Sequence, residues 1–268
     1  MNARLLIIDP QNDFCDIPGA ALPVPGADAD MQRLAALIRD ADFANITVTL
    51  DSHASVGIER TTFWSTASGD PVAPFTLISS DDVRAGRFRP RDAARTAATQ
   101  AYLDALERSG RYRLVVWPVH CVLGTWGHNI HAAVAGQLAQ WEQQTQRTVT
   151  RILKGLNPMT EQYSAVQAEV PVADDPRTQT NRALIDSVRP DGGRLLVAGE
   201  AASHCVAATM EHLFQALTPA ERRRVVLLRD CMSAVPGFEV QARKLLDDAR
   251  AQGADVMTAA EARARLAA

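Results

Sequence analysis

The sequence predicts an α/β protein in which a mostly parallel sheet of six strands lies between two layers of helices. Short apolar runs alternate with segments of helical period along all 268 residues, a pattern typical of strands joined by crossover helices. The run at residues 195–198 is apolar throughout, as are those at 5–8 and 225–228, which indicates strands buried on both faces of a parallel sheet. Polar residues follow several of the runs, at the sheet edge where open α/β proteins bind their ligands.

Six apolar runs predict the strands. In chain order they occupy residues 5–8, 46–50, 114–118, 148–153, 194–199 and 225–228. The fifth run ends at Gly199 and leads through a turn of small residues to Cys205, where we expect a helix to begin.

Segments of helical period separate these strands. Asp28 or Asp30 can cap the first helix, whose apolar face includes Met31 and Leu34. Further helices are expected at about residues 94–108, 126–146, 175–188, 203–217 and 238–251, with a short one near the C-terminus. No internal repeat, low-complexity segment or linker divides the chain, so we expect one domain covering residues 1–268.

The alternation is interrupted after residue 54 by a segment with several glycines and prolines and no clear period. Its aromatic residues Phe63, Trp64, Phe75 and Phe88 indicate that it packs against the protein. Loops of this length are uncommon in compact domains and are usually functional. We therefore expect an inserted, lid-like segment at about residues 54–112 that covers one edge of a site.

Composition and charge limit the partners of the protein. Hydrophobic residues make up 47% of the chain and charged residues 22%, as is ordinary for a globular protein. The net charge of -3 gives no electrostatic basis for binding nucleic acid or an anionic membrane. No apolar run approaches the ~20 residues that span a bilayer, and the N-terminus lacks a signal-peptide pattern. Four widely spaced cysteines suggest reduced thiols, so we expect a cytoplasmic protein.

Five of the predicted strands end at residues that can carry chemistry. These residues are Asp9, Asp51 with His53, His120, Lys154 and Cys205. Each has a structural alternative when taken singly, since Asp9 can cap a helix and Cys205 can be a small buried thiol. Because parallel strands bring their carboxyl ends to one edge of a sheet, we expect all of these side chains to converge.

Two kinds of chemistry fit this set. The start of a helix favours a thiolate at Cys205, Asp9 can accept the thiol proton, and a charged lysine nearby also favours the thiolate. Asp51 and His53 lie two residues apart on an extended segment and therefore point the same way. With His120 they would provide three protein ligands and leave open positions, as in a catalytic or substrate-binding zinc site.

At these motifs the chain resembles the isochorismatase-like cysteine hydrolases and, within them, the nicotinamidases. The matching motifs are Asp9-x-Gln11-x-Asp13-Phe14, Asp51-x-His53, Trp117-Pro118-x-His120-Cys121-Val122, Lys154-Gly155 followed by Tyr163-Ser164-Ala165, and Gly199-x-Ala201-x-x-x-Cys205-Val206. They occur in the family's order from Asp9 to Val206. The resemblance implies a six-stranded α/β/α sandwich with a catalytic triad.

The resemblance also assigns roles to residues. The implied triad is Asp9, Lys154 and Cys205, and the implied ligands of a divalent metal, typically zinc, are Asp51, His53 and His120. Backbone N–H groups of Ala201 and Cys205 are expected to form an oxyanion hole, with a cis peptide at Glu200–Ala201. The residues expected at the substrate pocket are Phe14, Trp117, Tyr163 and Glu200.

The expected function is therefore that of a metal-containing cysteine amidohydrolase. It would release ammonia from a small planar amide through a thioester, and we expect a homo-oligomer. Three features depart from the family pattern: Ala54–Arg60 after His53, the turn Glu200–His204, and the length of the inserted segment. They leave two alternatives open, namely an amidase for a ureido or carbamoyl compound and a catalytically silent binding protein.

Overall fold

A six-stranded parallel sheet forms the centre of the computed structural model, which describes residues 3–267. The strands follow the order β10-β9-β8-β1-β2-β7, and every neighbouring pair is parallel. Their bounds are β1 Ala3–Ile8, β2 Asn45–Asp51, β7 Thr150–Lys154, β8 Arg194–Gly199, β9 Val225–Leu228 and β10 Asp255–Met257. The predicted fold class is confirmed.

One predicted strand lies outside this sheet, and one strand of the sheet was not predicted. The run at residues 114–118 forms β6 (Leu114–Val116), which pairs antiparallel with β4 (Thr76–Ile78). All three residues of β6 are buried, so its hydrophobicity did not reveal which partner it would take. The sixth place in the sheet belongs to β10, a three-residue strand with only one buried residue and hence a weak apolar signal.

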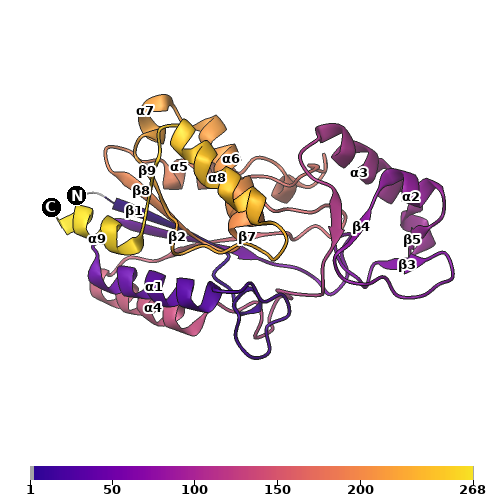
Figure 1. The fold of residues 1–268 in the computed structure, drawn as a ribbon, viewed down its shortest axis with the longest axis horizontal. Coiled ribbons are helices and arrows are strands. Elements are labelled where there is room, and N and C mark those ends of the chain that lie inside the picture. The colour runs from indigo at the N-terminus through magenta and orange to yellow at the C-terminus, as the bar shows by residue number, and fades with distance from the viewer. Residues whose placement is uncertain (1–2, 268) are drawn as a thin grey trace.

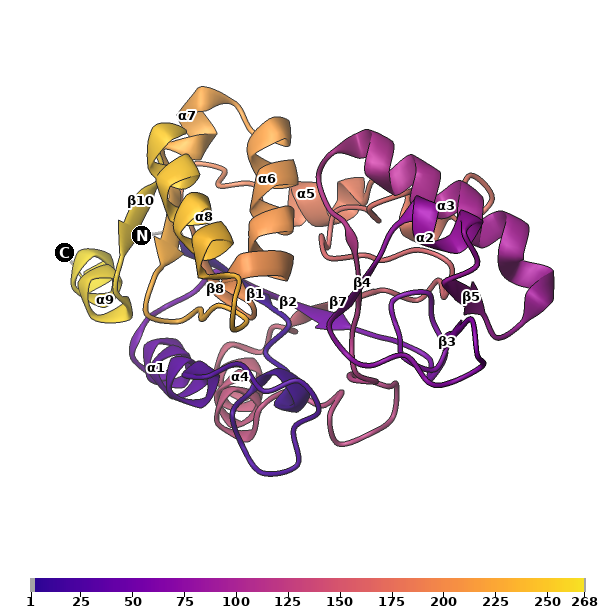
Figure 2. The same ribbon diagram turned by 45° about the vertical axis from the view of Figure 1, so that its right-hand side comes forward.

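Helices cover both faces of the sheet (Figures 1 and 2). One layer contains α1 (Ala27–Asp40), α4 (Ala132–Thr145) and α9 (Ala259–Ala267). The other contains α5 (Arg182–Val188), α6 (Ala207–Ala216), α7 (Pro219–Arg222) and α8 (Glu239–Ala251). Short helical turns are η1 (Asn12–Phe14), η2 (Ala93–Arg95), η3 (Pro176–Thr178) and the π-helical η4 (Ala202–Val206).

Helix α1 buries its predicted apolar face but is capped differently from the prediction. Its N-cap is Gly26, at φ 95°, whereas Asp28 and Asp30 lie in the first turn. The carboxylate of Asp16 accepts hydrogen bonds from the backbone N–H groups of Gly26 and Asp28, at 2.9 and 2.7 Å. The preceding loop therefore satisfies N–H groups that a helix leaves without partners.

Helix α4 begins at Ala132, six residues later than predicted. The residues just before α4 are held in an irregular conformation by the loop that follows β1. The backbone N–H of Asn12 donates to Asn129 O, that of Asp13 donates to Gly127 O, and the side chain of Gln11 donates to His128 O. These bonds occupy carbonyl groups that a longer helix would have used itself.

The inserted segment, residues 54–112, has its own secondary structure and lies beside the β7 edge of the sheet (Figure 2). It contains β3 (Trp64–Thr66), β4, α2 (Ser80–Arg84), β5 (Phe88–Pro90), η2 and α3 (Thr96–Ser109). Its buried cluster, which includes Ile58, Trp64 and Leu103, is distinct from the main core. Trp64 and Phe63 pack as predicted, whereas Phe75 is 52% exposed.

Two further expectations concern the chain as a whole. Within residues 3–267, no helix has the length and apolar character that crossing a membrane requires. Cys15, Cys121, Cys205 and Cys231 are all free thiols and all buried, in agreement with the prediction of reduced cysteines.

Candidate active site

Three neighbouring strands bring Asp9, Asp51 and Lys154 together. Asp9 follows β1, Asp51 ends β2, and Lys154 ends β7 directly opposite Asp51. The Lys154 Nζ lies 2.9 Å from Asp9 Oδ2 and 2.8 Å from Asp51 Oδ1, and all three side chains are buried. Burial alone would lower the pKa of Lys154, but Asp51 and Asp9 raise it well above its usual range, so the amine stays charged.

Cys205 reaches this cluster from η4, which follows β8. The Lys154 Nζ donates to Cys205 Sγ at 3.5 Å and lies 2.9 Å from Asp9 Oδ2, so the lysine links the thiol to the Asp9 carboxyl group. Burial raises the pKa of the thiol well above its usual range, with Lys154 opposing the shift. Burial also raises the pKa of Asp9, again against Lys154. The resting pair is therefore a thiol beside a carboxylate that can accept its proton.

The turn before Cys205 exposes a backbone donor to the site. The peptide bond Glu200–Ala201 is cis, at the position that the resemblance implied. His204 N and Val206 N both donate to Ala201 O, and Ala202 N donates to Ser233 O at 2.7 Å. Among residues 3–267, the N–H of Ala201 has no hydrogen-bond partner, so it is available to a bound oxygen atom.

A second cluster contains Asp51, His53 and His120. Each offers one ligand atom, and these atoms all lie within 4.8 Å of one another in a buried position. His53 Nε2 is 2.7 Å from Asp51 Oδ2, and His120 Nε2 is 3.4 Å from the same oxygen. Two imidazoles and a carboxylate at this spacing fit a divalent metal ion.

The charges around this cluster also favour a bound cation. Burial opposes protonation of His53, but Asp51 outweighs it and raises the pKa of His53 to about 9. Burial, together with the charge of Arg60, lowers the pKa of His120 to about 4. A metal ion at this position would replace the proton of His53.

Two residues that were not predicted support the cluster from behind. Glu59 Oε1 lies 3.2 Å from His53 Nδ1 and accepts a hydrogen bond from Arg60 Nε at 2.9 Å. Arg60 Nη1 lies 2.7 Å from His120 Nδ1. Both residues come from the inserted segment and are buried. Their adjacent opposite charges were visible in the sequence, but nothing there indicated which histidines they would contact.

A cavity of about 30 Å³ lies against Cys205. Its lining residues are Phe14, Leu22, Asp51, Trp117, Lys154, Glu161, Tyr163, Ala201, His204, Cys205 and Val235. Phe14, Trp117 and Tyr163 lie on its wall, where the sequence placed them. Glu200 does not line the cavity, because its carboxylate turns toward the backbone N–H of Ser233.

His204 is a cavity residue that the sequence did not single out, although it precedes the predicted nucleophile. Its ring lies 4.6 to 5.2 Å from those of Phe238, Trp117 and Tyr163, and burial lowers its pKa to about 4. Val235 N donates to Ser203 Oγ at 3.1 Å, and this hydroxyl lies 2.9 Å from His204 Nδ1. The Ser203 hydroxyl therefore contacts both a backbone N–H and the His204 ring, and it fixes the orientation of that ring.

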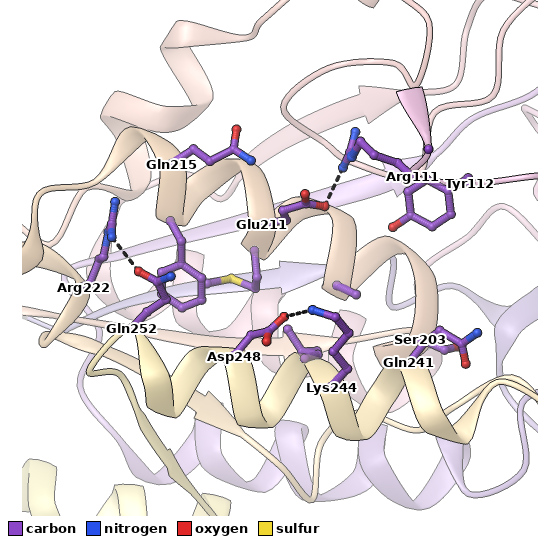
Figure 3. A pocket seen from close by; sticks show the side chains of 15 residues that line it. Arg111, Tyr112, Ser203, Glu211, Gln215, Arg222, Gln241, Lys244, Asp248 and Gln252 are labelled. Atoms are coloured by element: carbon purple, nitrogen blue, oxygen red, sulfur yellow. Dashed lines mark hydrogen bonds and ion pairs between the residues drawn. The ribbon is translucent and has the colours of Figure 1, made fainter. Parts of the chain in front are cut away.

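A larger cleft of about 600 Å³ lies between α6 and α8, away from this chemistry (Figure 3). Its charged side chains pair with one another, as Arg111 does with Glu211 at 2.8 Å and Lys244 does with Asp248. None of the residues predicted for catalysis or metal binding lines it. Asp51, Lys154 and Cys205 line the smaller cavity instead.

Sequence comparison identifies a curated relative. No family model matches the chain. The nicotinamidase of Saccharomyces cerevisiae is 26% identical over 207 residues, which are 76% of this chain and 78% of that protein. The resemblance predicted from the motifs is therefore confirmed.

Solved structures share the fold. The yeast nicotinamidase Pnc1p has a TM-score of 0.64 at 22% identity, with 95% of this chain and 99% of that one covered. A pyrazinamidase of Pyrococcus horikoshii in complex with zinc has a TM-score of 0.54 at 19% identity, with 96% and 99% covered. An isochorismatase family protein of Desulfovibrio vulgaris has a TM-score of 0.52 at 20% identity, with 100% and 99% covered. The chain has the α/β fold of these proteins.

Proposed function

We propose that this protein is a metal-containing cysteine amidohydrolase that releases ammonia from a small planar amide such as nicotinamide. The observation that carries the proposal is the contact of Lys154 with both Asp9 and Cys205 at the carboxyl ends of the strands. A protein that only binds a ligand has no need of a thiol, a base and a buried cation in contact. Similarity to a nicotinamidase supports the class of substrate.

The proposed reaction begins at the Cys205 sulfur. Asp9 takes the thiol proton as the sulfur attacks the amide carbonyl carbon, and Lys154 balances the negative charge of the resulting thiolate. The backbone N–H groups of Ala201 and Cys205 donate to the oxyanion of the tetrahedral intermediate.

The intermediate then loses ammonia. Asp9 donates its proton to the leaving nitrogen as the C–N bond breaks, and a thioester to Cys205 remains. A water molecule attacks the thioester while Asp9 accepts one of its protons. The products are a carboxylic acid and the restored thiol, so each proton that Asp9 takes is returned.

Asp51, His53 and His120 are the residues that would hold the metal ion. When bound there, a zinc ion would act as a Lewis acid that holds the ring nitrogen of an aromatic amide. The paired imidazoles favour zinc over calcium or magnesium, which prefer oxygen ligands. The zinc complex of the Pyrococcus horikoshii relative supports this choice.

The walls of the cavity favour a flat substrate. Phe14 and Trp117 can pack against an aromatic ring, while His204 brings a neutral imidazole to the cavity wall as a hydrogen-bonding group.

Ammonia release from a panel of amides tests the proposal. Nicotinamide, pyrazinamide, other small amides and ureido compounds are offered to the purified, zinc-loaded protein. We expect turnover of a planar aromatic amide and a loss of about a thousandfold or more in Cys205→Ala. Cys231→Ala removes another buried thiol and should remain active. Absence of turnover by the wild type, or undiminished turnover by Cys205→Ala, contradicts the proposal.

A further inference from the structure

Glu200 is a buried acid in the turn that precedes Cys205, and the proposed mechanism does not use it. Its side chain is 0% exposed, and its Oε2 accepts a hydrogen bond from the backbone N–H of Ser233 at 3.1 Å. Its Oε1 is buried without a hydrogen-bond donor anywhere in the part of the chain that the structure describes. A buried carboxylate oxygen without a donor destabilises the folded protein, so the groups around this oxygen must offset that cost.

The neighbour of Glu200 is a second carboxyl group, on α1. Asp30 is also buried, and both carboxyl groups accept from the same residue, Glu200 from the Ser233 N–H and Asp30 from the Ser233 hydroxyl. The Asp30 oxygens already accept from Ser233 Oγ and from Arg33 Nη2, each at 2.5 Å. Two carboxyl groups can form a hydrogen bond only if one of them carries a proton. A proton on Glu200 would give Oε1 the partner that it lacks.

The other groups around Glu200 favour that proton. Burial raises the pKa of Glu200 well above its usual range, and the charges of Asp30 and Asp16 raise it further. The thiols of Cys15 and Cys231 also lie close enough to interact with it. Arg33 is the nearby cation, and it pairs with Asp30. Asp30 therefore has a cationic partner, whereas Glu200 has none among residues 3–267, so we assign the proton to Glu200.

Hydrogen bonds connect this pair to the proposed oxyanion hole. Ser233 N donates to the Glu200 side chain, while Ser233 O accepts from Ala202 N at 2.7 Å. The N–H of Glu200 itself donates to Ile8 O at 2.8 Å. These two bonds hold the Gly199–Glu200 and Ala201–Ala202 peptide groups, which flank the peptide that carries the Ala201 N–H, and Glu200 supports the second of them through Ser233.

Close packing at the start of α1 keeps Ser233 in place. A Cβ atom at Gly26 would lie 3.0 Å from Ser233 Oγ, and Gly26 has a φ of 95° that favours glycine. Helix α1 therefore lies close enough to Ser233 for Asp30 to accept a hydrogen bond from the serine hydroxyl.

We propose that Glu200 is a positioning residue, held as the neutral acid by a proton shared with Asp30, that orients the Ala201 N–H toward the oxyanion. Its role in orientation rests on the proposed function, whereas its protonation does not. Gln has the shape of the neutral acid and can donate to Asp30 while accepting from Ser233. Leu fills similar space and can do neither.

The protonation is tested without any substrate. Burial also raises the pKa of Glu161 to about 8, so the two proteins are compared by difference. At pH 8 the infrared spectrum of the wild type minus that of Glu200→Gln should contain the carbonyl band of a buried carboxylic acid. A difference spectrum without that band overturns the shared proton.

Thermal unfolding provides an independent measure of the same proton. A raised pKa means that folded Glu200 keeps its proton where the unfolded acid, with an ordinary value of 4.5, has lost it. The contribution of Glu200 to the free energy of unfolding is therefore fully present below pH 4.5 and is lost as pH rises toward the folded pKa, whereas Glu200→Gln has no such pH dependence at this position. The melting temperature of Glu200→Gln minus that of the wild type should increase between pH 5 and pH 8. A difference that does not change with pH overturns the proposal.

The positioning role is tested by kinetics on the amide that the wild type turns over. Loss of an oxyanion donor costs about a hundredfold in kcat, so misorientation in Glu200→Leu should lower kcat at least about tenfold with little change in KM. Glu200→Gln should restore most of kcat. Equal kcat for the wild type and Glu200→Leu, or equally poor Leu and Gln variants, overturns the role. If no amide is turned over, the proposed function fails, whereas the infrared and melting results still decide the protonation.

Discussion

His53 has a carboxylate beside each of its ring nitrogens. Asp51 Oδ2 lies 2.7 Å from Nε2, and Glu59 Oε1 lies 3.2 Å from Nδ1. If His53 held a metal ion through one ring nitrogen, the proton of the neutral ring would be on the other, and Glu59 would be the acceptor beside Nδ1. Such a bond orients the imidazole and increases its basicity toward the metal.

We expect Glu59→Gln to weaken metal binding about tenfold, because loss of this partner typically costs 10–100-fold in affinity. The measurement is a competition titration with a chromophoric chelator. Glu142→Gln is the matched control, since Glu142 also pairs with an arginine, Arg151 at 3.2 Å, but on the surface of α4. Equal metal affinities of the two variants would show that Glu59 does not support the metal site.

His204 makes a residue-level prediction about substrate binding. His204→Phe keeps an aromatic ring against Trp117 and removes the hydrogen-bonding nitrogens of a residue that lines the cavity. A neutral hydrogen bond contributes about 1 kcal/mol, so KM should rise about fivefold with a smaller change in kcat.

The matched control for this prediction is another buried histidine bonded to a serine. His212 Nδ1 lies 2.8 Å from Ser164 Oγ, its pKa is also lowered to about 4 by burial, and it does not line the cavity. His212→Phe should lower stability and leave KM close to that of the wild type. A similar KM for both variants would mean that His204 does not contact the substrate.

The turn after β7 lies beside both clusters of the site, the one with Asp9 and Cys205 and the one with His53 and His120. Lys154 ends the strand, and Gly155 follows with a φ of 76°. A Cβ atom at Gly155 would lie only 2.6 Å from Cε1 of His53, so the absence of a side chain there makes room for a metal ligand. Gly192 has a similar φ of 73°, but a Cβ atom there would have no other atom within 4 Å.

Alanine substitutions at these two glycines distinguish the effect of backbone strain from the effect of contact with His53. Gly155→Ala and Gly192→Ala should both destabilise the protein by about 1–2 kcal/mol, because alanine is strained in the left-handed region. Only Gly155→Ala should also displace His53 and lower metal affinity by about tenfold or more. Melting temperatures and metal titrations of the two variants check this, and equal metal affinities would contradict it.

Elements differed in how far the sequence could specify them. The strands that lead to Asp9, Asp51, Lys154 and Cys205 were predictable because each is an apolar run that ends in a polar residue or a turn. The pairing of β6 was not, since its three buried residues suit either sheet. The start of α4 was also not predictable, because Gln11 and Asn12, more than 100 residues away, bind the carbonyl groups before it.

At the scale of the whole molecule, topology explains why much of the candidate site was predictable. Parallel strands deliver their carboxyl ends to one edge, so residues distant in sequence converge without any knowledge of side-chain packing. Glu59 and Arg60 reach the same place by a different route, through a segment with its own core. No periodicity in the sequence describes that path, and for this reason their roles emerged only from the structure.

The two separate cores predict a local opening of the inserted segment. Leu103 is fully buried on α3 in the cluster of that segment, so Leu103→Ala should cost about 2–5 kcal/mol. Because this cluster is distinct from the main core among residues 3–267, the loss should fall mainly on residues 58–116.

Hydrogen exchange measures where that loss falls. We expect faster amide exchange across residues 58–116 in Leu103→Ala, while β1 and β8 keep their protection. Metal affinity should fall as well, since Glu59 and Arg60 belong to the loosened segment. Leu138→Ala, in α4 and equally buried in the main core, should instead reduce the protection of β1 and β8. If Leu103→Ala exposes β1 and β8 to the same extent as residues 58–116, the inserted segment and the sheet unfold as one cooperative unit, and the metal site depends on the stability of the whole chain.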